Sequence, residues 1–281
     1  MSTLNHKIDF VALISVNMAN GNGDPLDGNR PRTDYSGYGE ISDVCIKRKI
    51  RNRMQDMGHE IFVQSADRAT DEMGSLSERA SAAMGKEKNR DVYARKACEK
   101  WLDVRSFGQV FAFKSNEKDG VSVGVRGPVS IHQAVSVSPV EVVSMQITKS
   151  VNGEPDNKRS SDTMGSKHFV RFGLYVLKGS VNVQLAEKTL FSEEDALVVK
   201  EALRTLFRND SSAARPEGSM EVGKLYWFDH NCKDGQYSSA KVHRSVRVAQ
   251  KNPAAVPTCI EDYEITLEEL PGLVPEVIDG E

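Results

Sequence analysis

Apolar residues recur along the chain with two periods, one typical of strands and the other of helices. Residues 7–17 are almost continuously apolar, as expected of a strand buried on both faces. Residues 41–57 return to a helical period, and their apolar positions form a core-facing stripe. Residues 18–40 between them are rich in glycine, proline and asparagine, so we expect a long loop with no periodic element.

The middle of the chain predicts helices followed by extended segments. Residues 60–64 fit a short strand, and residues 76–102 fit two helical pieces. Residues 128–137 and 140–150 alternate or run apolar, which indicates a strand pair or long hairpin with one polar face. Residues 151–167 follow as a polar, slightly basic loop.

The last third predicts strands around one well-marked helix. Residues 169–178 fit a strong strand, and residues 192–207 fit a helix with Ser192 as its N-cap. Residues 220–229 and 240–249 fit closing strands. The coarse order is therefore β-α-β, inserted material, then β-α-β. This order predicts an α+β protein of the ferredoxin-like, RRM type.

We expect one such domain over residues 1–260, with two insertions. Residues 65–100 form the helical insertion and residues 115–167 the hairpin. Composition separates an acidic C-terminal segment, residues 261–281. The net charge of the whole chain is −3, but this segment carries eight of the 40 acidic residues and no Lys or Arg. The rest of the chain sets 32 acidic residues against 37 basic ones, a net charge of +5.

Composition also excludes several classes of protein. A hydrophobic fraction of 39% with 27% charged residues is ordinary for a globular chain. No apolar run approaches the roughly 20 residues of a membrane span, and the N-terminus has no signal-peptide pattern. The cysteines are scattered without a C-x-x-C pair, which argues against a disulfide scaffold or zinc ribbon and for a reducing cytoplasm. They are Cys45, Cys98, Cys232 and Cys259.

The glycine- and asparagine-rich loop is the first candidate site. It joins a strand to a helix, where glycine lets a phosphate approach the backbone and the helix N-terminus is electropositive. It lacks the Gly-Lys-Ser/Thr of a P-loop, the third glycine of a dinucleotide fingerprint and the spacing of an EF-hand. A structured loop without a ligand is the alternative. The candidate phosphate-contacting side chains are Asn20, Asn22, Arg30 and Arg32.

The following helix is the second candidate, because it packs cations densely. Positive side chains on a helix face suit a phosphate backbone, since each contact releases counterions. A solvated helix face is the alternative. The cations that we expect to contact phosphate are Lys47, Arg48, Lys49 and Arg51.

The hairpin insertion is the third candidate, through Arg126, Lys149 and Lys167. It can wedge against bases or hold a neighbouring subunit, and plain surface variation is the alternative. No catalytic residue, metal site or cofactor is predicted, since no nucleophile elbow or zinc motif is present. The loop carboxylates Asp24, Asp27 and Asp34 fit turn caps better than metal ligands.

Three sequence blocks resemble one family. Residues 20–34 with residues 41–52 resemble the N-terminal signature of the CRISPR-associated backbone subunit of type I-C Cascade, the Csd-type branch of the RAMP superfamily. Residues 103–108 (DVRSFG) resemble its D-x-R-x-F-G block, and residues 126–140 resemble its G-P-V…S-x-x-P-V block. One position departs: Gly21 stands where family members often have proline.

The resemblance implies a non-catalytic RNA-binding protein with an RRM-like palm, helical fingers and a β-hairpin thumb. Copies of such a subunit assemble as a helical filament along the spacer part of a CRISPR guide RNA, beside other Cascade subunits. The guide's bases stay free to pair with target DNA in antiviral defence. Two alternatives remain: a metal-dependent endoribonuclease that uses Asp24, and a single-strand nucleic-acid module without a CRISPR role.

Overall fold

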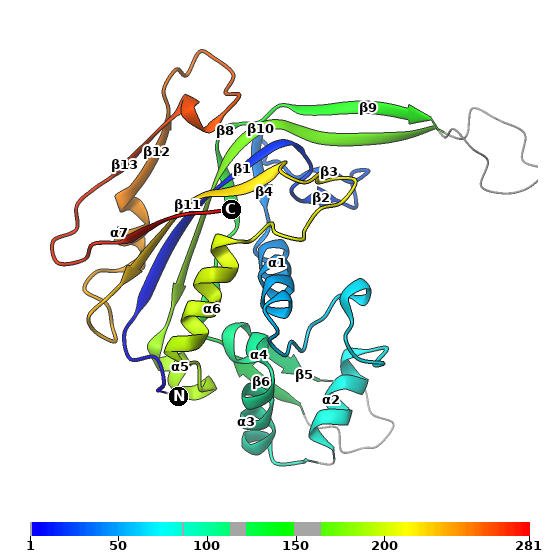
Figure 1. Ribbon diagram of the computed structural model, residues 1–281, viewed down its shortest axis with the longest axis vertical. Helices are drawn as coiled ribbons and strands as arrows, with labels where there is room; N and C mark the ends of the chain where they lie inside the picture. The colour runs from blue at the N-terminus through cyan, green and yellow to red at the C-terminus, as the bar shows by residue number, and fades with distance from the viewer. Residues whose placement is uncertain (1, 86, 113–121, 149–163) are drawn as a thin grey trace, which may run out of the picture.

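The computed structural model describes residues 2–85, 87–112, 122–148 and 164–281. Its centre is a large antiparallel sheet in the order β14-β11-β1-β10-β8-β4, with β7 and β9 also paired to β10 (Figure 1). The first predicted strand is confirmed as β1, which spans Ile8–Ala19 and pairs with β10 on one side and β11 on the other. The strands of this sheet are β1 (Ile8–Ala19), β4 (Tyr38–Ile41), β7 (Val129–Ile131), β8 (Ala134–Pro139), β9 (Val142–Thr148), β10 (Met164–Val181), β11 (Met220–Asp229) and β14 (Glu276–Asp279).

Two long helices cover one face of this sheet (Figure 1). Helix α1 (Asp43–Asp56) starts at Ser42, whose side chain accepts from the amide of Cys45. Helix α6 (Glu193–Arg204) starts at Ser192, where a capping box satisfies two backbone amides. The apolar stripes of both helices pack on alternate residues of β1, from Phe10 to Val16, to make the main core.

The chain reaches the four central strands in the order β1, β8, β10, β11, but they lie in the order β11-β1-β10-β8. Helix α1 lies between β1 and β8 in sequence, and helices α5 (Val183–Thr189) and α6 lie between β10 and β11. All neighbours in this group are antiparallel. The predicted alternation of strands and helices therefore folds into one sheet with its two crossovers on the same side.

The opposite face of the sheet is covered as well. Helix α7 (Ser239–Ser245) and the two-stranded sheet of β12 (Val246–Gln250) and β13 (Tyr263–Leu267) pack there around Val11, Leu13 and Phe228. The prediction of one strand over 240–249 is wrong in its first half, which is helical because Ser238 caps a helix start.

Residues 261–281, set apart by composition, lie within this architecture. Strand β13 pairs with β12, and β14 adds an edge strand beside β11. Some of its acidic side chains pair with cations of the same chain: Lys200 binds Glu276 at 2.7 Å, and Arg204 binds Glu281 at 2.6 Å. Part of the acidic charge is thus balanced locally at the sheet edge.

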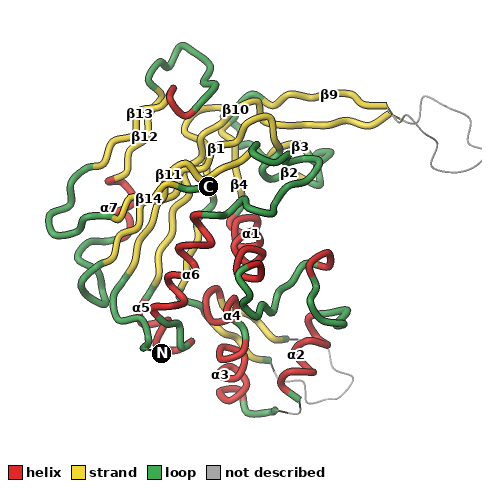
Figure 2. Tube along the Cα trace, viewed as in Figure 1, coloured by secondary structure: helices red, strands yellow, loops and turns green. Residues whose placement is uncertain are grey.

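A separate module, called the finger module below, lies beneath the sheet (Figure 2). It consists of α2 (Leu76–Met84), α3 (Arg90–Lys100), α4 (Leu102–Phe107) and the hairpin of β5 (Gly108–Phe111) with β6 (Val123–Arg126). The helical prediction for 76–102 is confirmed. The module has its own aromatic core, in which the ring centroids of Phe62 and Trp101 lie 4.6 Å apart. The predicted strand at 60–64 is wrong, because these residues run as irregular chain that is held by side chains.

The strand pairings around the projecting hairpin also differ from the prediction. Strand β9 pairs with the first part of β10, not with the strand before it, and this ribbon extends away from the sheet (Figure 1). Residues 164–167 of the predicted polar loop belong to β10. The segment 18–40 also contains strands: β2 (Gly23–Asp24) pairs with β3 (Arg30–Pro31), and β4 pairs with β8.

A buried charge cluster fixes the start of β1. Asp9 is fully buried and lies 2.9 Å from Nζ of Lys7 and 2.9 Å from Nε2 of His230. Nδ1 of His230 accepts from the amide of Gln236, so its proton is on Nε2 and is donated to Asp9. Burial alone raises the pKa of Asp9, but hydrogen bonds from His230, Ser239 and Lys7 outweigh it and keep the pKa below its ordinary value.

We predict that Asp9→Asn lowers the free energy of unfolding at pH 7 by about 3 kcal/mol, since the ammonium group of Lys7 then loses its buried carboxylate partner. Because folding lowers the pKa of Asp9, its carboxylate stabilises the fold above the unfolded-state pKa of about 4. This contribution is lost as the pH falls through the folded-state pKa. The difference in melting temperature between wild type and variant should therefore shrink below about pH 4. A difference that is constant down to pH 2.5 would contradict this assignment. Calorimetry across pH measures both.

Candidate nucleic-acid interface

The glycine- and asparagine-rich loop is held in shape by its own polar side chains. Nδ2 of Asn20 donates to the carbonyl of Asn29 at 2.6 Å, and Oδ1 of Asn22 accepts from the amide of Ser42 at 2.9 Å. Asn20 is buried. The structure thus places these two predicted contact residues inside the loop, as braces, and leaves the outer surface to the arginines.

Arg30 joins this loop to the projecting hairpin. Its Nη1 donates to Oγ of Ser144 on β9 at 2.7 Å, and the same hydroxyl lies 2.9 Å from Nδ1 of His168 on β10. Arg32 lies on the same loop, 3.3 Å from the carboxylate of Asp24 and about a third exposed. The first and third candidate regions therefore form one continuous surface at the end of β1.

The cations of α1 are divided between the interior and the surface. Lys49 is 4% exposed, pairs with Asp210 and lies 5.4 Å above the ring centroid of Phe207. Burial lowers its pKa, although the Asp210 carboxylate opposes this. Arg51 is 12% exposed and donates to Asp103 at 3.0 Å. Contrary to the expectation from charge density, Lys49 and Arg51 are packed into the fold and have little surface for a phosphate.

Lys47 and Arg48 remain on the outer side of α1. Lys47 pairs with Asp43 one turn earlier at 2.9 Å and is about a quarter exposed. Nη1 of Arg48 donates to the carbonyl of Val63 at 2.6 Å, which anchors its guanidinium beside the finger module. Partial burial and the neighbouring Arg51 lower the pKa of Arg48.

An open pocket beside Arg48 is lined by residues that were not predicted from the sequence as contacts. Arg68 comes from the segment before α2, and Arg215 from the loop after α6. Arg215 is 2.9 Å from Asp210, and Arg68 is 2.6 Å from Asp56. Oδ1 of Asn52, in the pocket wall, is buried without a partner among the described residues. These residues are far apart in sequence, so no local pattern marks them as one site.

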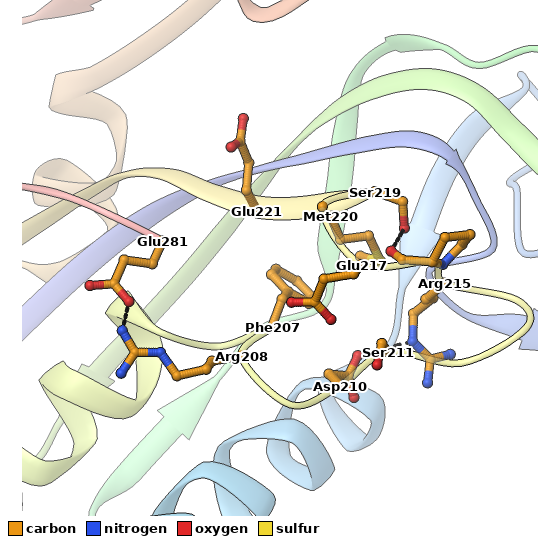
Figure 3. A pocket seen from close by; sticks show the side chains of 12 residues that line it. Phe207, Arg208, Asp210, Ser211, Arg215, Glu217, Ser219, Met220, Glu221 and Glu281 are labelled. Atoms are coloured by element: carbon orange, nitrogen blue, oxygen red, sulfur yellow. Dashed lines mark hydrogen bonds and ion pairs between the residues drawn. The ribbon is translucent and has the colours of Figure 1, made fainter.

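The loop 208–219 separates this pocket from a second hollow, shown in Figure 3. There the guanidinium of Arg208 meets the carboxylate of Glu281, and Asp210 faces Arg215. The amide of Asn20 donates to the carbonyl of Ala214 at 2.9 Å. This contact sets the loop against the glycine-rich segment, so the Arg215 side of the loop belongs to the same surface.

The remaining predicted contacts lie apart from this pocket. Arg126 is exposed at the end of β6, in the finger hairpin. Lys167 is on β10, opposite Met145 of β9, and Lys149 falls outside the described residues. Met145 and Met164 are about half exposed on the hairpin, which gives it an apolar surface as well.

The block DVRSFG has a structural role in the fold. Asp103 accepts from Arg51 and from the amides of Phe62 and Val63 at 2.7 and 3.1 Å. Arg105 binds Asp195 of α6 with two hydrogen bonds of 2.8 Å. The block therefore clamps the finger module to both helices of the sheet.

No group of three or more His, Cys, Asp or Glu side chains that could hold a metal is found in the described parts of the chain. Asp24 accepts from the amide of Leu26 at 3.1 Å and binds Arg32. Asp34 accepts from the amides of Ser36 and Tyr38. Both carboxylates serve as turn braces. Within the described ranges, no helix has the length and apolarity to cross a membrane.

The fold and surface thus define an α+β protein with a large antiparallel sheet, a helical module, a projecting hairpin and arginines on open surfaces. Residues 6–268 match the profile of the family described as CRISPR-associated protein Cas7, and the chain belongs to that family.

A relative from Haloferax volcanii, described as CRISPR-associated protein Cas7, is 27% identical over 217 residues. The match covers 69% of this chain and 62% of the relative, so the chain matches less than two thirds of the relative's length. A solved chain from a "CRISPR RNA-guided surveillance complex, pre-nicking" shares the fold at a TM-score of 0.50 and 16% identity, covering 84% of this chain and 81% of that one. A chain from a "CRISPR RNA-guided surveillance complex" aligns at a TM-score of 0.46 and 18% identity, covering 85% and 74%.

We predict that Asp103→Ala lowers the free energy of unfolding by about 3 kcal/mol, because Arg51 and two backbone amides lose their buried partner. Urea unfolding followed by tryptophan fluorescence measures it. The matched control is Asp91→Ala, an exposed carboxylate in the first turn of α3, which should cost less than about 1 kcal/mol. Equal losses in the two variants would show that the clamp does not hold the fold.

Proposed function

We propose that this protein is a non-catalytic backbone subunit of a type I-C CRISPR surveillance complex. Copies of it bind guide RNA, assemble as a helical filament along the spacer and present the bases to target DNA. The proposal places the complex in the cytoplasm, where other Cascade subunits complete it. Membership of the Cas7 family and the complexes named for the solved neighbours support this role.

One structural observation carries the proposal: the glycine-rich loop, the outer side of α1 and the hairpin meet at one end of the sheet. The hydrogen bond between Arg30 and Ser144 joins the loop to the hairpin, and Arg48 and Arg215 line the pocket beside α1. Cations on loops held by a rigid sheet suit a phosphate backbone, which carries no sequence information. A subunit that carries guides of any sequence needs sequence-independent contacts, because base pairing and not the protein recognises the target.

The palm is proposed to be RRM-like. The order β11-β1-β10-β8 with antiparallel neighbours, and both crossover helices on one face, supports this assignment. The finger is then the module around α2 and α3, within the predicted helical insertion at 65–100, and the thumb is the β9–β10 hairpin.

The proposed phosphate contacts are revised by burial. Lys49 and Arg51 support the fold, and Asn20 and Asn22 brace the loop. Arg126, at the end of β6, remains a proposed contact, and so does Lys149, which falls outside the described residues. The side chains proposed to face RNA are Arg48, Arg68 and Arg215 at the pocket, Lys47 on α1, and Arg30, Arg32 and Lys167 on the loop and the β9–β10 hairpin.

We predict that the double variant Arg48→Gln/Arg215→Gln purifies with several-fold less RNA than wild type. Each lost phosphate contact should lower the slope of log affinity against log salt by about 0.7. The ratio of absorbance at 260 and 280 nm and a salt titration with a labelled guide RNA measure the two effects. Sequencing of the co-purified RNA should return CRISPR repeat-spacer transcripts.

The matched control is Arg90→Gln/Lys188→Gln, which removes the same charge from exposed positions on α3 and α5. Its RNA content and salt slope should equal those of wild type. Equal RNA content and equal salt slopes in the two double variants would show that the pocket does not bind RNA. Recovery of unrelated RNA from the wild type would favour a general single-strand module.

The endoribonuclease alternative rests on Asp24 in the loop after β1. Its carboxylate already binds Arg32 and the amide of Leu26. We therefore expect no cleavage when the assembled complex is incubated with RNA complementary to the guide and with Mg²⁺. Gel analysis over hours, with Asp24→Ala in parallel, measures it. Cleavage by wild type that is lost in Asp24→Ala would establish the enzyme.

A further inference from the structure

A second basic groove lies on the opposite face of the sheet. Two adjoining hollows share Lys178, Val246 and Val248 and so form one continuous depression. One wall is α7 and β12, and the other is formed by β8 and β10. The groove is open to solvent along its length, so it fits an extended chain better than a small enclosed ligand.

Four cations line this groove. Arg247 pairs with Glu268 at 2.6 Å. Among the described residues, Lys178, Lys241 and Arg244 form no ion pair, although Nζ of Lys241 lies 4.3 Å above the ring centroid of Tyr237. Most other basic side chains in the structure have a carboxylate partner. Here three cations on adjacent rigid elements have no carboxylate partner, so their charge is neutralised only by an external anion or by counterions.

The groove is distant from the proposed guide surface. Lys178 pairs in register with Val11 near the start of β1, whereas the glycine-rich loop follows Ala19 at its end. Eight residues of strand separate Val11 from Ala19, which is about 26 Å. The cations of the two surfaces therefore do not contact the same few phosphates.

The floor of the groove between the cations is mixed. Val135, Val137, Val176, Val246 and Val248 lie there beside Ser136, while His132 and Gln133 lie at one end. Valine side chains give van der Waals contact to a sugar ring, and the polar groups beside them can hydrogen-bond to it.

From this geometry we infer that the groove formed by Lys178, Lys241, Arg244 and Arg247 is a second nucleic-acid site, and that its ligand is a single strand. The cations contact successive phosphates, and the valines support the sugar rings. Sequence specificity is absent, because the groove offers few groups that can read a base edge. The inference does not depend on the guide-binding role.

The test uses the full chain as purified and a fluorescent oligo(dT) of about 20 nucleotides. Lys241→Gln/Arg244→Gln changes two exposed side chains of α7 and should leave the melting temperature unchanged. Fluorescence anisotropy at about 0.1 M salt should show roughly tenfold weaker binding. The salt slope should fall by about 1.4, the value for two contacts to a single strand. The content of co-purified RNA should equal that of wild type.

The charge-matched control is again Arg90→Gln/Lys188→Gln, for which oligo(dT) binding should equal that of wild type. Unchanged oligo(dT) binding in the groove variant would overturn the site. A parallel loss of co-purified RNA would show that the groove and the guide surface are one site, and would also overturn the assignment of a second site. A change in sedimentation without a change in oligo(dT) binding would identify a protein interface instead.

Discussion

The buried carboxylate of Asp103 is the contact on which the arrangement of the molecule depends. A desolvated charge is costly unless hydrogen bonds and an opposite charge compensate it, and here Arg51 and the amides of Phe62 and Val63 do so. These partners come from α1 and from the irregular chain that leads into the finger module. Two residues on, Arg105 binds Asp195 of α6. One short block thus sets the finger against both helices that cover the sheet, and positions Arg48 beside the pocket.

The sheet is covered on both faces, and this constrains where a ligand can bind. Helices α1 and α6 cover one face, and α7, β12 and β13 cover the other. The two proposed binding surfaces therefore lie at the periphery: the loop and hairpin at one end of β1, and the groove beside α7 near the other. Both present cations with few base-reading groups, as the proposed sequence-independent binding requires.

Charge in this chain is organised by pairing more than by density. The cation-rich helix α1 places Lys49 and Arg51 in the interior with Asp210 and Asp103. The acidic C-terminal segment in turn neutralises Lys200 and Arg204 at the sheet edge. What remains for a ligand is a smaller set of arginines and lysines on separate elements. Net charge, or its division between body and tail, therefore did not locate the surfaces available to an anion.

The sequence by itself determined β1, α1 and α6, because a buried strand and two amphipathic helices each show a characteristic spacing of apolar residues within a short segment. It also marked the glycine-rich loop and the blocks of the family. Only the tertiary structure decided that β9 pairs with β10, that 38–41 is a strand and that 276–279 closes a sheet edge, since strand pairing joins distant residues. The same holds for the site. Lys49 borders the apolar stripe of α1, and whether it meets RNA or Asp210 depends on a loop 161 residues away that no local pattern reveals.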